Sequence, residues 1–342
     1  MLRKSIVILL ALSLGLTGCS LSRQEEGPTK YQASFLTLFD TVTYISGYAE
    51  SEAEFQETAQ AIHDELMVYH QLFDIYNDYD GLNNLKTVND NAGIAPVEVD
   101  GKIIDLLSDC RAYYDLTGGK VNVAMGSVLN LWHIARNDGL DDPENAYLPD
   151  ADALAQAAEH TSWDSVIIDE AASTVYLADP EMRLDVGAVA KGWSAQKVAE
   201  NAPEGLLISV GGNVCATGAK ADGSAWIIGI ADPDDGSSYL HTLYATEGAF
   251  VTSGDYQRYY GVDGKTYHHI IDPETLYPAA NWRSVTIICA DSGLADALST
   301  ALFLLPQAEG QTLLDRCGAL ALWVDAEGNE FMSPGFEDYI RS

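Results

Sequence analysis

The segment Val285-Thr-Ile-Ile-Cys-Ala290 is followed at once by Asp291-Ser-Gly-Leu-Ala-Asp-Ala-Leu-Ser-Thr300. The first part is a short apolar run rich in β-branched residues, which is typical of a buried strand. The second part predicts a helix that begins near Ser292. Asp296 and Thr300 are four residues apart, so on this helix they share one face.

Similar patterns recur on both sides of this segment. Apolar runs predict strands at residues 41–48, 206–210, 225–231 and 240–246 and a hairpin at 165–177, while helical spacing of apolar residues marks 54–76 and 103–116. Strands and helices interleave without strict alternation. This favours an α+β (mixed α/β) fold, with largely antiparallel sheets flanked by helices, over a doubly wound parallel sheet. The acidic stretches 137–142 and 232–238 are expected to be surface loops.

The composition describes a globular and strongly acidic chain. It has 342 residues, 47% of them hydrophobic, and 18 basic against 51 acidic side chains, for a net charge of −33. This apolar content suffices for a core, which excludes disorder. The charge would repel phosphate backbones and anionic lipids, so nucleic acid is excluded as a partner. Any anionic ligand must be neutralised locally, by a metal ion or by a few well-placed cations.

The first residues have the pattern of a secretory signal. Arg3 and Lys4 precede an apolar run over residues 6–16, and Leu16-Thr-Gly-Cys19 resembles a bacterial lipobox. We therefore expect a lipoprotein signal peptide at 1–18, a lipidated Cys19 with a polar tether at 19–30, and one catalytic domain at 31–342. The protein would be exported and lipid-anchored to the outer face of the bacterial cytoplasmic membrane. The alternative is a plain signal peptide with an incidental cysteine.

The remaining cysteines and several absent motifs narrow the chemistry. No Cys-x-x-Cys pair is present among Cys110, Cys215, Cys289 and Cys317, which argues against a zinc or redox dithiol site and favours buried free thiols. The chain also has no P-loop, no Gly-x-Gly-x-x-Gly, no His-Glu-x-x-His and no Gly-x-Ser-x-Gly. A calcium loop around Asp78-Tyr-Asp-Gly81 is rejected, because Tyr76 and Thr87 would occupy ligand positions.

Five polar blocks lie at predicted strand ends or helix starts. They are Asp185-Val-Gly-Ala-Val-Ala-Lys-Gly192, Ser209-Val-Gly-Gly-Asn213, Val251-Thr-Ser-Gly-Asp-Tyr256, His268-His-Ile-Ile-Asp-Pro273 and Ser292 to Ala301. In the first block a strand is expected to deliver Asp185, and Lys191 is expected in the first turn of a helix whose free N–H groups suit an anion.

Each block alone has an ordinary structural explanation. Asp185 could accept hydrogen bonds in a turn, Lys191 could be a solvated helix cation, and His269 could be a hydrogen-bonded core histidine. Together the blocks would suit a phosphate-containing ligand, a general base and a hard cation. A carboxylate, a hydroxyl and a backbone carbonyl suit Mg²⁺, which also binds substrate phosphates.

These residues resemble the FAD:protein FMN transferases, or ApbE-like flavin transferases, from about residue 35 to residue 332. The resemblance rests on the first four of the blocks above and on Ala295-Asp-Ala-x-Ser-Thr300 within the fifth. It also rests on four further segments, which are Phe39-Asp-Thr41, Thr117-Gly-Gly119, Met125-Gly126 and Asn130-Leu-Trp132. It implies an ApbE-like fold with a single catalytic unit. It also implies an enzyme that cleaves the FAD pyrophosphate with Mg²⁺, attaches FMN through a phosphoester to a Thr or Ser hydroxyl, and releases AMP.

The resemblance also implies partners and site residues. The acceptor would be a flavoprotein subunit or domain of a membrane or extracytoplasmic redox system. The metal ligands would be Asp296, Thr300 and the carbonyl of Ala188, and His269 would be the general base. The flavin-nucleotide contacts would be Phe39, Tyr76, Lys120, Val121, Asn122, Asp185, Lys191 and Ile271.

The chain departs from the family pattern at a few positions. Lys120 and Asn122 stand where an acidic residue and a small neighbour are common, which leaves the contribution of Asn122 to binding open. Phe39 replaces a common methionine and preserves apolar bulk.

Two other functions remain open from sequence. The same site could hydrolyse FAD to FMN and AMP as a pyrophosphatase, or the protein could be a non-catalytic, lipid-anchored flavin-binding protein. Self-flavinylation is not expected, because the implied Ser/Thr-Gly-Ala-Thr acceptor sequence is absent, and the nearest segment is Cys215-Ala-Thr217.

Overall fold

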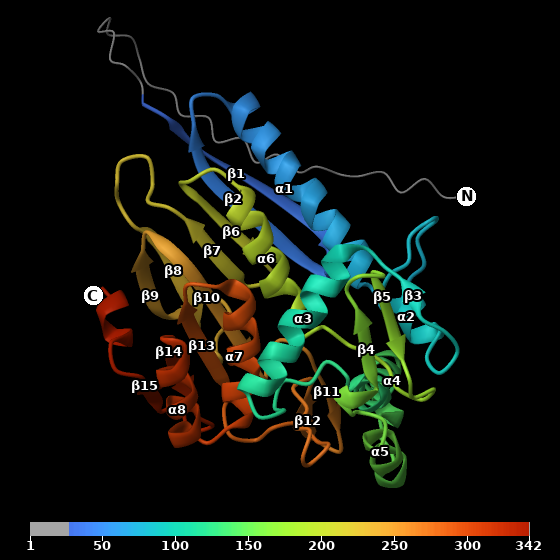
Figure 1. The fold of residues 1–342 in the computed structure, drawn as a ribbon. Helices are drawn as coiled ribbons and strands as arrows, with labels where there is room; N and C mark the ends of the chain where they lie inside the picture. Colours follow the sequence, from blue (N-terminus) through green and yellow to red (C-terminus); the bar gives the residue numbers. More distant parts are fainter. Residues whose placement is uncertain (1–26, 342) are drawn as a thin grey trace, which may run out of the picture.

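The computed structural model describes residues 27–341 (Figure 1). The predicted signal peptide, Cys19 and most of the tether lie outside this range. Thr29 and Lys30, which the sequence assigned to the tether, are the first residues of strand β1. Within the described residues, no helix is long and apolar enough to cross a membrane.

An eight-stranded antiparallel sheet forms the centre of the molecule. Its strand order is β1-β2-β6-β7-β10-β13-β14-β15, and every pairing within it is antiparallel. The strands are β1 (Thr29–Leu38), β2 (Thr41–Ala49), β6 (Leu206–Val210), β7 (Asn213–Thr217), β10 (Glu247–Gly254), β13 (Ser284–Cys289), β14 (Leu320–Val324) and β15 (Glu330–Met332).

Helices cover one face of this sheet (Figure 1). Helix α1 (Glu52–Phe73) packs on β1 and β2, α6 (Ala190–Asn201) on β6 and β7, and α7 (Ser292–Leu304) on β10 and β13. Helix α3 (Gly101–Leu116) contacts α1, and α8 (Gln307–Cys317) contacts α7 and β14. The main hydrophobic core lies between these helices and the sheet.

A β-hairpin covers part of the opposite face. Strands β8 (Trp226–Ala231) and β9 (Tyr239–Ala245) pair with each other and, with the short helix η3 (Phe336–Tyr339), enclose a second apolar cluster. Ile287 belongs to the helix-side core and Ile288 to this second cluster. Because both faces of β13 are covered, all six of its residues are buried, which explains its continuous apolar run.

The remaining elements form a lobe beside the sheet. They are α2 (Leu85–Asp90), β3 (Val97–Glu98), α4 (Gly126–Asp141), η1 (Pro143–Asn145), α5 (Ala151–Ala158), η2 (Trp163–Ser165), β4 (Val166–Asp169), β5 (Thr174–Leu177), β11 (Tyr259–Val262) and β12 (Lys265–His268). Strands β3, β5 and β4 form one small antiparallel sheet, and β11 and β12 form another.

The predicted fold class and most of the predicted elements are confirmed, including the hairpin at β4 and β5. One loop prediction was wrong, because residues 137–141 continue helix α4. Trp132, Ala135 and Gly139 extend the buried face of α4 at helical spacing. Gly139 lies so close to the Tyr260 ring that a Cβ there would be 2.8 Å from it. The acidic side chains of this stretch therefore lie on the exposed side of a helix.

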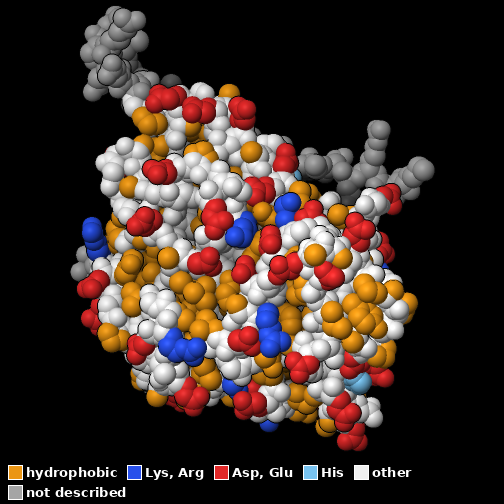
Figure 2. All heavy atoms as spheres, viewed as in Figure 1, with side chains coloured by type: hydrophobic (Ala, Val, Ile, Leu, Met, Phe, Trp, Pro, Cys, Tyr) orange, Lys and Arg blue, Asp and Glu red, His pale blue; other side chains and the backbone are white. Residues whose placement is uncertain are grey.

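The cysteines and the surface agree with the sequence. Cys110, Cys215 and Cys289 are buried free thiols, and Cys317 is free and half-buried. Acidic side chains are spread over the face in Figure 2, with only a few lysines and arginines among them.

Candidate active site

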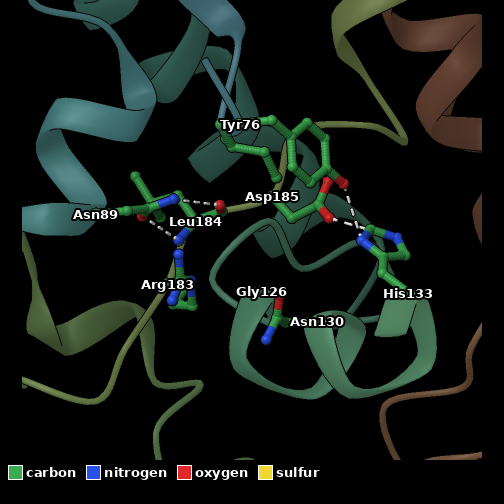
Figure 3. Close-up of a pocket in the computed structure, with 9 residues that line it drawn as sticks. Tyr76, Asn89, Gly126, Asn130, His133, Arg183, Leu184 and Asp185 are labelled. Carbon is green, nitrogen blue, oxygen red and sulfur yellow. Dashed lines mark hydrogen bonds and ion pairs between the residues drawn. The ribbon is translucent and has the colours of Figure 1, made fainter. Parts of the chain in front are cut away.

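A cleft lies where α4, the segment before α6, and the end of β12 meet. One part is a small pocket lined by Ile75, Tyr76, Asn89, Gly126, Asn130, His133, Arg183, Leu184 and Asp185 (Figure 3). A second pocket is lined by Leu129, Trp132, His133, Arg136, Tyr260, Tyr267, His268 and His269. His133 lines both, so the two pockets adjoin at its imidazole.

Asp185 is held in an irregular segment, and the prediction that a strand delivers it was wrong. The Asn89 side chain accepts a 2.7 Å hydrogen bond from the Leu184 N–H and donates to the Leu184 carbonyl at 3.0 Å. The Asp185 N–H donates to the Val123 carbonyl, and its carboxylate accepts from the Gly187 N–H at 2.9 Å. Side-chain bonds from a distant residue replace strand pairing here and fix the carboxylate at the cleft.

His133 connects two of the predicted flavin contacts. Its Nδ1 forms a 2.9 Å hydrogen bond with the Tyr76 hydroxyl, and its Nε2 lies 3.9 Å from an Asp185 carboxylate oxygen (Figure 3). Burial lowers the pKa of His133, while the Asp185 carboxylate opposes that shift. The imidazole therefore links the exposed Tyr76 ring to the buried Asp185 carboxylate.

His269 follows β12 and lines the second pocket. Its Nδ1 is 3.2 Å from the Arg258 carbonyl. Because a carbonyl only accepts, Nδ1 carries the proton and Nε2 keeps a free lone pair. Burial, with the positive charges of Arg258, His268 and Lys191, lowers the pKa of His269 to about 3. The ring is therefore neutral at pH 7, with the Nε2 lone pair unprotonated.

Lys191 and Asp296 meet at the contact between α6 and α7. Asp296 Oδ2 accepts a 2.8 Å hydrogen bond from the Gly192 N–H and lies 3.4 Å from the Lys191 ammonium. The ammonium is also 3.3 Å from the Gly187 carbonyl. Burial raises the pKa of Asp296, and the Lys191 charge opposes this shift. Lys191 stands in the first turn of α6, as predicted.

The donor set around Asp296 suits a hard cation. Among residues 27–341 no hydrogen bond reaches its Oδ1, although the residue is only 4% exposed. Thr300 lies one turn further along α7, and Ala188 lies in the turn that leads into α6. No cluster of three His, Cys, Asp or Glu side chains occurs in the described part of the chain. A metal ion here would therefore depend on one carboxylate together with hydroxyl, carbonyl and ligand oxygens.

The predicted Lys120-Val-Asn122 contacts have structural roles within the protein. The Lys120 ammonium pairs with Asp272 at 3.2 Å and with Glu274 at 2.9 Å. Val121 is buried in the core, and the Asn122 amide bonds to the Thr161 carbonyl and the Ala124 N–H. Lys120 thus ties this loop to the segment after His269.

Phe39 and Ile271 frame the site in different ways. Phe39 and Asp40 form the β1–β2 turn with φ values of 53° and 52°, a left-handed conformation that is costly for residues other than glycine. The Phe39 N–H donates to His70 Nδ1 at 3.2 Å. The Ile271 side chain packs in an apolar cluster with Trp132 and Tyr260, so only its backbone is free to face a ligand.

Sequence reasoning missed His133, Arg136 and Arg258. His133 and Arg136 lie on α4, part of which had been taken for a loop, and Arg258 directly precedes β11. The signal that could have found the first two is the Asn130-Leu-Trp132 block. Its continuation at helical spacing places His133 and Arg136 together.

Comparison with known proteins gives the family. The sequence model of the ApbE family matches residues 37–323. The chain belongs to the ApbE family. Among its relatives, the FAD:protein FMN transferase of Treponema pallidum is 35% identical over 277 residues, which cover 75% of each chain. The FAD:protein FMN transferase of Escherichia coli K12 is 27% identical over 355 residues, covering 98% of this chain and 97% of the relative.

Solved ApbE structures have the same fold. The ApbE protein of Thermotoga maritima superposes with a TM-score of 0.81 at 29% identity, covering 92% of this chain and all of that one. The flavin transferase ApbE of Vibrio cholerae gives a TM-score of 0.75 at 23% identity, covering 91% and 99% of the two chains. The antiparallel sheet flanked by helices is therefore the ApbE fold.

Proposed function

We propose that this ApbE-family protein is an Mg²⁺-dependent FAD:protein FMN transferase. It cleaves the FAD pyrophosphate, joins FMN through a phosphoester to a Thr or Ser hydroxyl of a partner flavoprotein, and releases AMP. Family membership and relatives of that name support the activity. The observation that carries the proposal is His269, with Nδ1 protonated against the Arg258 carbonyl and Nε2 free in the cleft.

His269 is suited to the proton transfer. The acceptor hydroxyl oxygen attacks the FMN phosphorus, and its proton passes to Nε2. A new P–O bond forms to the acceptor while the P–O bond to AMP breaks, and AMP leaves with the electron pair. A histidine with a free lone pair at pH 7 begins this step in the required protonation state.

Lys191 and Asp296, at the contact between α6 and α7, serve the phosphates. Lys191 and the N-terminus of α6 offset pyrophosphate charge that the acidic surface would otherwise repel. Asp296, Thr300 and the Ala188 carbonyl would hold Mg²⁺, which supplies Lewis-acid stabilisation of the phosphates when bound. The exposed Tyr76 ring and Phe39 offer apolar surface to the flavin or adenine rings.

The acceptor and location follow from the same proposal. The partner is a flavoprotein subunit or domain of a membrane or extracytoplasmic redox system. The enzyme is exported, anchored through lipidated Cys19 to the outer face of the bacterial cytoplasmic membrane, and reaches that partner on the tether.

The test is to incubate the mature protein with FAD, Mg²⁺ and a candidate acceptor domain, following acceptor mass and AMP together. A mass gain of one FMN with matching AMP is the expected result. AMP release without a mass gain across a panel of acceptors would favour the pyrophosphatase. Tight FAD binding with neither product would favour the flavin-binding protein.

A further inference from the structure

His133 stands where the two pockets of the cleft adjoin, and the proposed chemistry gives it no role. Its imidazole lines both pockets. Nδ1 is 2.9 Å from the Tyr76 hydroxyl oxygen, and Nε2 is 3.9 Å from Oδ2 of Asp185. Figure 3 shows both of these side chains pointing toward the ring. Both are among the predicted flavin-nucleotide contacts, so His133 is placed to act on how the nucleotide is held.

The Asp185 carboxylate decides which nitrogen of the neutral His133 ring carries the proton. A carboxylate only accepts hydrogen bonds, so Nε2, which lies nearest to it, carries the proton. Nδ1 then keeps its lone pair and accepts the hydrogen bond that the Tyr76 hydroxyl donates. In the described part of the chain, the one side-chain hydrogen bond of Asp185 comes from the Gly187 N–H and reaches Oδ1. Oδ2 therefore stays available to a ligand while His133 is neutral.

Protonation of His133 changes both contacts. Both ring nitrogens are then donors, so Nδ1 no longer accepts from the Tyr76 hydroxyl, and the imidazolium pairs with Oδ2 of Asp185. Burial lowers the pKa of His133, and the charges of two arginines act in the same direction, against the opposing effect of Asp185. The ring is therefore neutral at pH 7 and takes up its proton only in acid. The charged or titratable groups that act on the ring or share its pockets are Tyr76, Asp185, Arg136, Arg258, His268 and His269, with the tyrosines of β11 and β12.

We propose that neutral His133 is a positioning residue for FAD, which holds the Tyr76 hydroxyl through Nδ1 and leaves Oδ2 of Asp185 free to accept a hydrogen bond from the nucleotide. This role rests on the proposed function, in which the protein binds FAD. The protonated ring pairs with Asp185 and competes with FAD for the same oxygen. A ligand that prefers one form of a protein binds less tightly as that form is depleted. FAD affinity therefore falls as the pH is lowered and His133 takes up its proton.

The test measures the Kd of FAD by quenching of flavin fluorescence between pH 8 and pH 5, with EDTA present so that no Mg²⁺-dependent turnover consumes the FAD. The native protein should bind FAD about threefold more weakly at pH 5 than at pH 8. H133N should show no such decline, because its amide oxygen can still accept from the Tyr76 hydroxyl and does not titrate. H133F keeps a flat ring but makes neither contact, so it should bind about tenfold more weakly than H133N at pH 8.

A second measurement needs no ligand. The ¹⁵N NMR signals of the histidine side chains report which nitrogen carries the proton, and the His133 signals are identified by their absence in H133N. The Nε2–H tautomer is expected at pH 8. The matched control is H241N, which removes a surface histidine paired with Glu330 and should keep the native dependence of FAD affinity on pH.

Three results would overturn the role of His133. They are the Nδ1–H tautomer at pH 8, a dependence of FAD affinity on pH that H133N shares with the native protein, and equal FAD affinity of H133F and H133N. FMN transfer to an acceptor, followed by mass, tests the enzyme separately. Transfer together with any of these results would remove only the role of His133, whereas a native protein that binds no FAD would remove the proposed function and this role together.

Discussion

His269 shows how one backbone contact decides the chemistry of a side chain. The Arg258 carbonyl fixes the proton on Nδ1, and burial keeps the ring neutral. H269Q should therefore lose about 10²- to 10⁴-fold in kcat for FMN transfer, the usual contribution of a general base. Transfer is measured by acceptor mass, and FAD affinity should change little. H241Q, which alters a surface histidine paired with Glu330, should leave the rate unchanged. A rate in H269Q close to the native value would exclude His269 as the base.

Asp296 is a proposed Mg²⁺ ligand, so its substitution should remove the effect of Mg²⁺ on thermal stability, which the substitution of a purely structural carboxylate would not do. Mg²⁺ should raise the melting temperature of the native protein, because a ligand at 100 times its Kd adds about 2.7 kcal/mol to the free energy of unfolding. D296N should lose this shift while remaining folded, since the amide still accepts from the Gly192 N–H. D291N is the matched control on α7. Asp291 caps that helix, asparagine caps equally well, and the Mg²⁺ shift should persist.

Local spacing in the sequence could predict which residues share a helix face, but not which residues the tertiary fold brings together. Asp296 and Thr300 share a helix face because of a four-residue spacing, which can be read directly. The ligand contact predicted for Lys120 stays a prediction, whereas its ion pair with Asp272, 152 residues away, had no signal in the sequence. Arg136 and Arg258 have no carboxylate within ion-pair distance among residues 27–341, and no sequence pattern specifies which carboxylates fold nearby.

At the scale of elements, the site depends on the close approach of α6 and α7. A Cβ on Gly192 would lie 2.3 Å from the Ser292 carbonyl oxygen and 2.4 Å from the Asp296 Cβ. G192A should therefore destabilise the protein by about 1–3 kcal/mol in urea unfolding, the usual cost of overpacking, and should weaken Mg²⁺ binding. G101A should be neutral or slightly stabilising, because nothing lies within 4 Å of a Cβ there at the start of α3. Equal stability of G192A and the native protein would mean that the two helices can separate without cost.

The end of α5 provides a pH-dependent contact between elements. His160 Nδ1 pairs with Asp179 at 2.8 Å, and this hydrogen bond raises the pKa of His160 above its usual value. The folded state therefore binds the His160 proton more tightly than the unfolded chain does. The stabilisation of the folded state by this pair is complete at pH values below the pKa of His160 in the unfolded chain, about 6.5. It is lost as the pH rises through the pKa of His160 in the folded state. The difference in unfolding free energy between the native protein and H160N should be larger at pH 6 than at pH 8.5. This difference should stay below about 1 kcal/mol, because the pair is partly exposed. A difference independent of pH would show that the pair does not couple protonation to folding.

Helices and strands were predicted correctly where the spacing of hydrophobic residues alone is enough to define them. Strand β13 and helices α1, α3 and α7 are apolar runs or apolar stripes, and their burial in the core follows from the pattern. The stretch 137–141 was misread because its charges suggested a loop, although Ala135 and Gly139 continue the buried stripe of α4. The Asp185 segment is irregular because Asn89, 95 residues earlier, takes over the backbone bonds of Leu184. No local pattern could indicate that bond.

At the scale of the whole molecule, the proposed function depends on a few cations in a strongly acidic protein. The chain has a net charge of −33, and acidic side chains are spread over the face seen in Figure 2. Arg136, in contrast, lines the same pocket as His269, and the charges of Arg258 and Lys191 help to lower the pKa of His269. An anionic ligand is therefore repelled at long range and bound only where these cations lie.

The same charge distribution predicts how salt affects stability. Like charges lie closer together in the compact state than in the unfolded chain, so their repulsion favours unfolding, and salt screens it over about 10 Å at 0.1 M. The melting temperature at pH 8 should rise by a few degrees between about 10 and 300 mM NaCl. The measurement is calorimetry with EDTA present, which excludes a contribution from bound divalent cations. At pH 5, closer to the sequence pI of about 4.2, the net negative charge is smaller, and the rise should be smaller. A melting temperature that falls with salt at pH 8 would mean that local ion pairs such as Lys120–Asp272 outweigh the net repulsion.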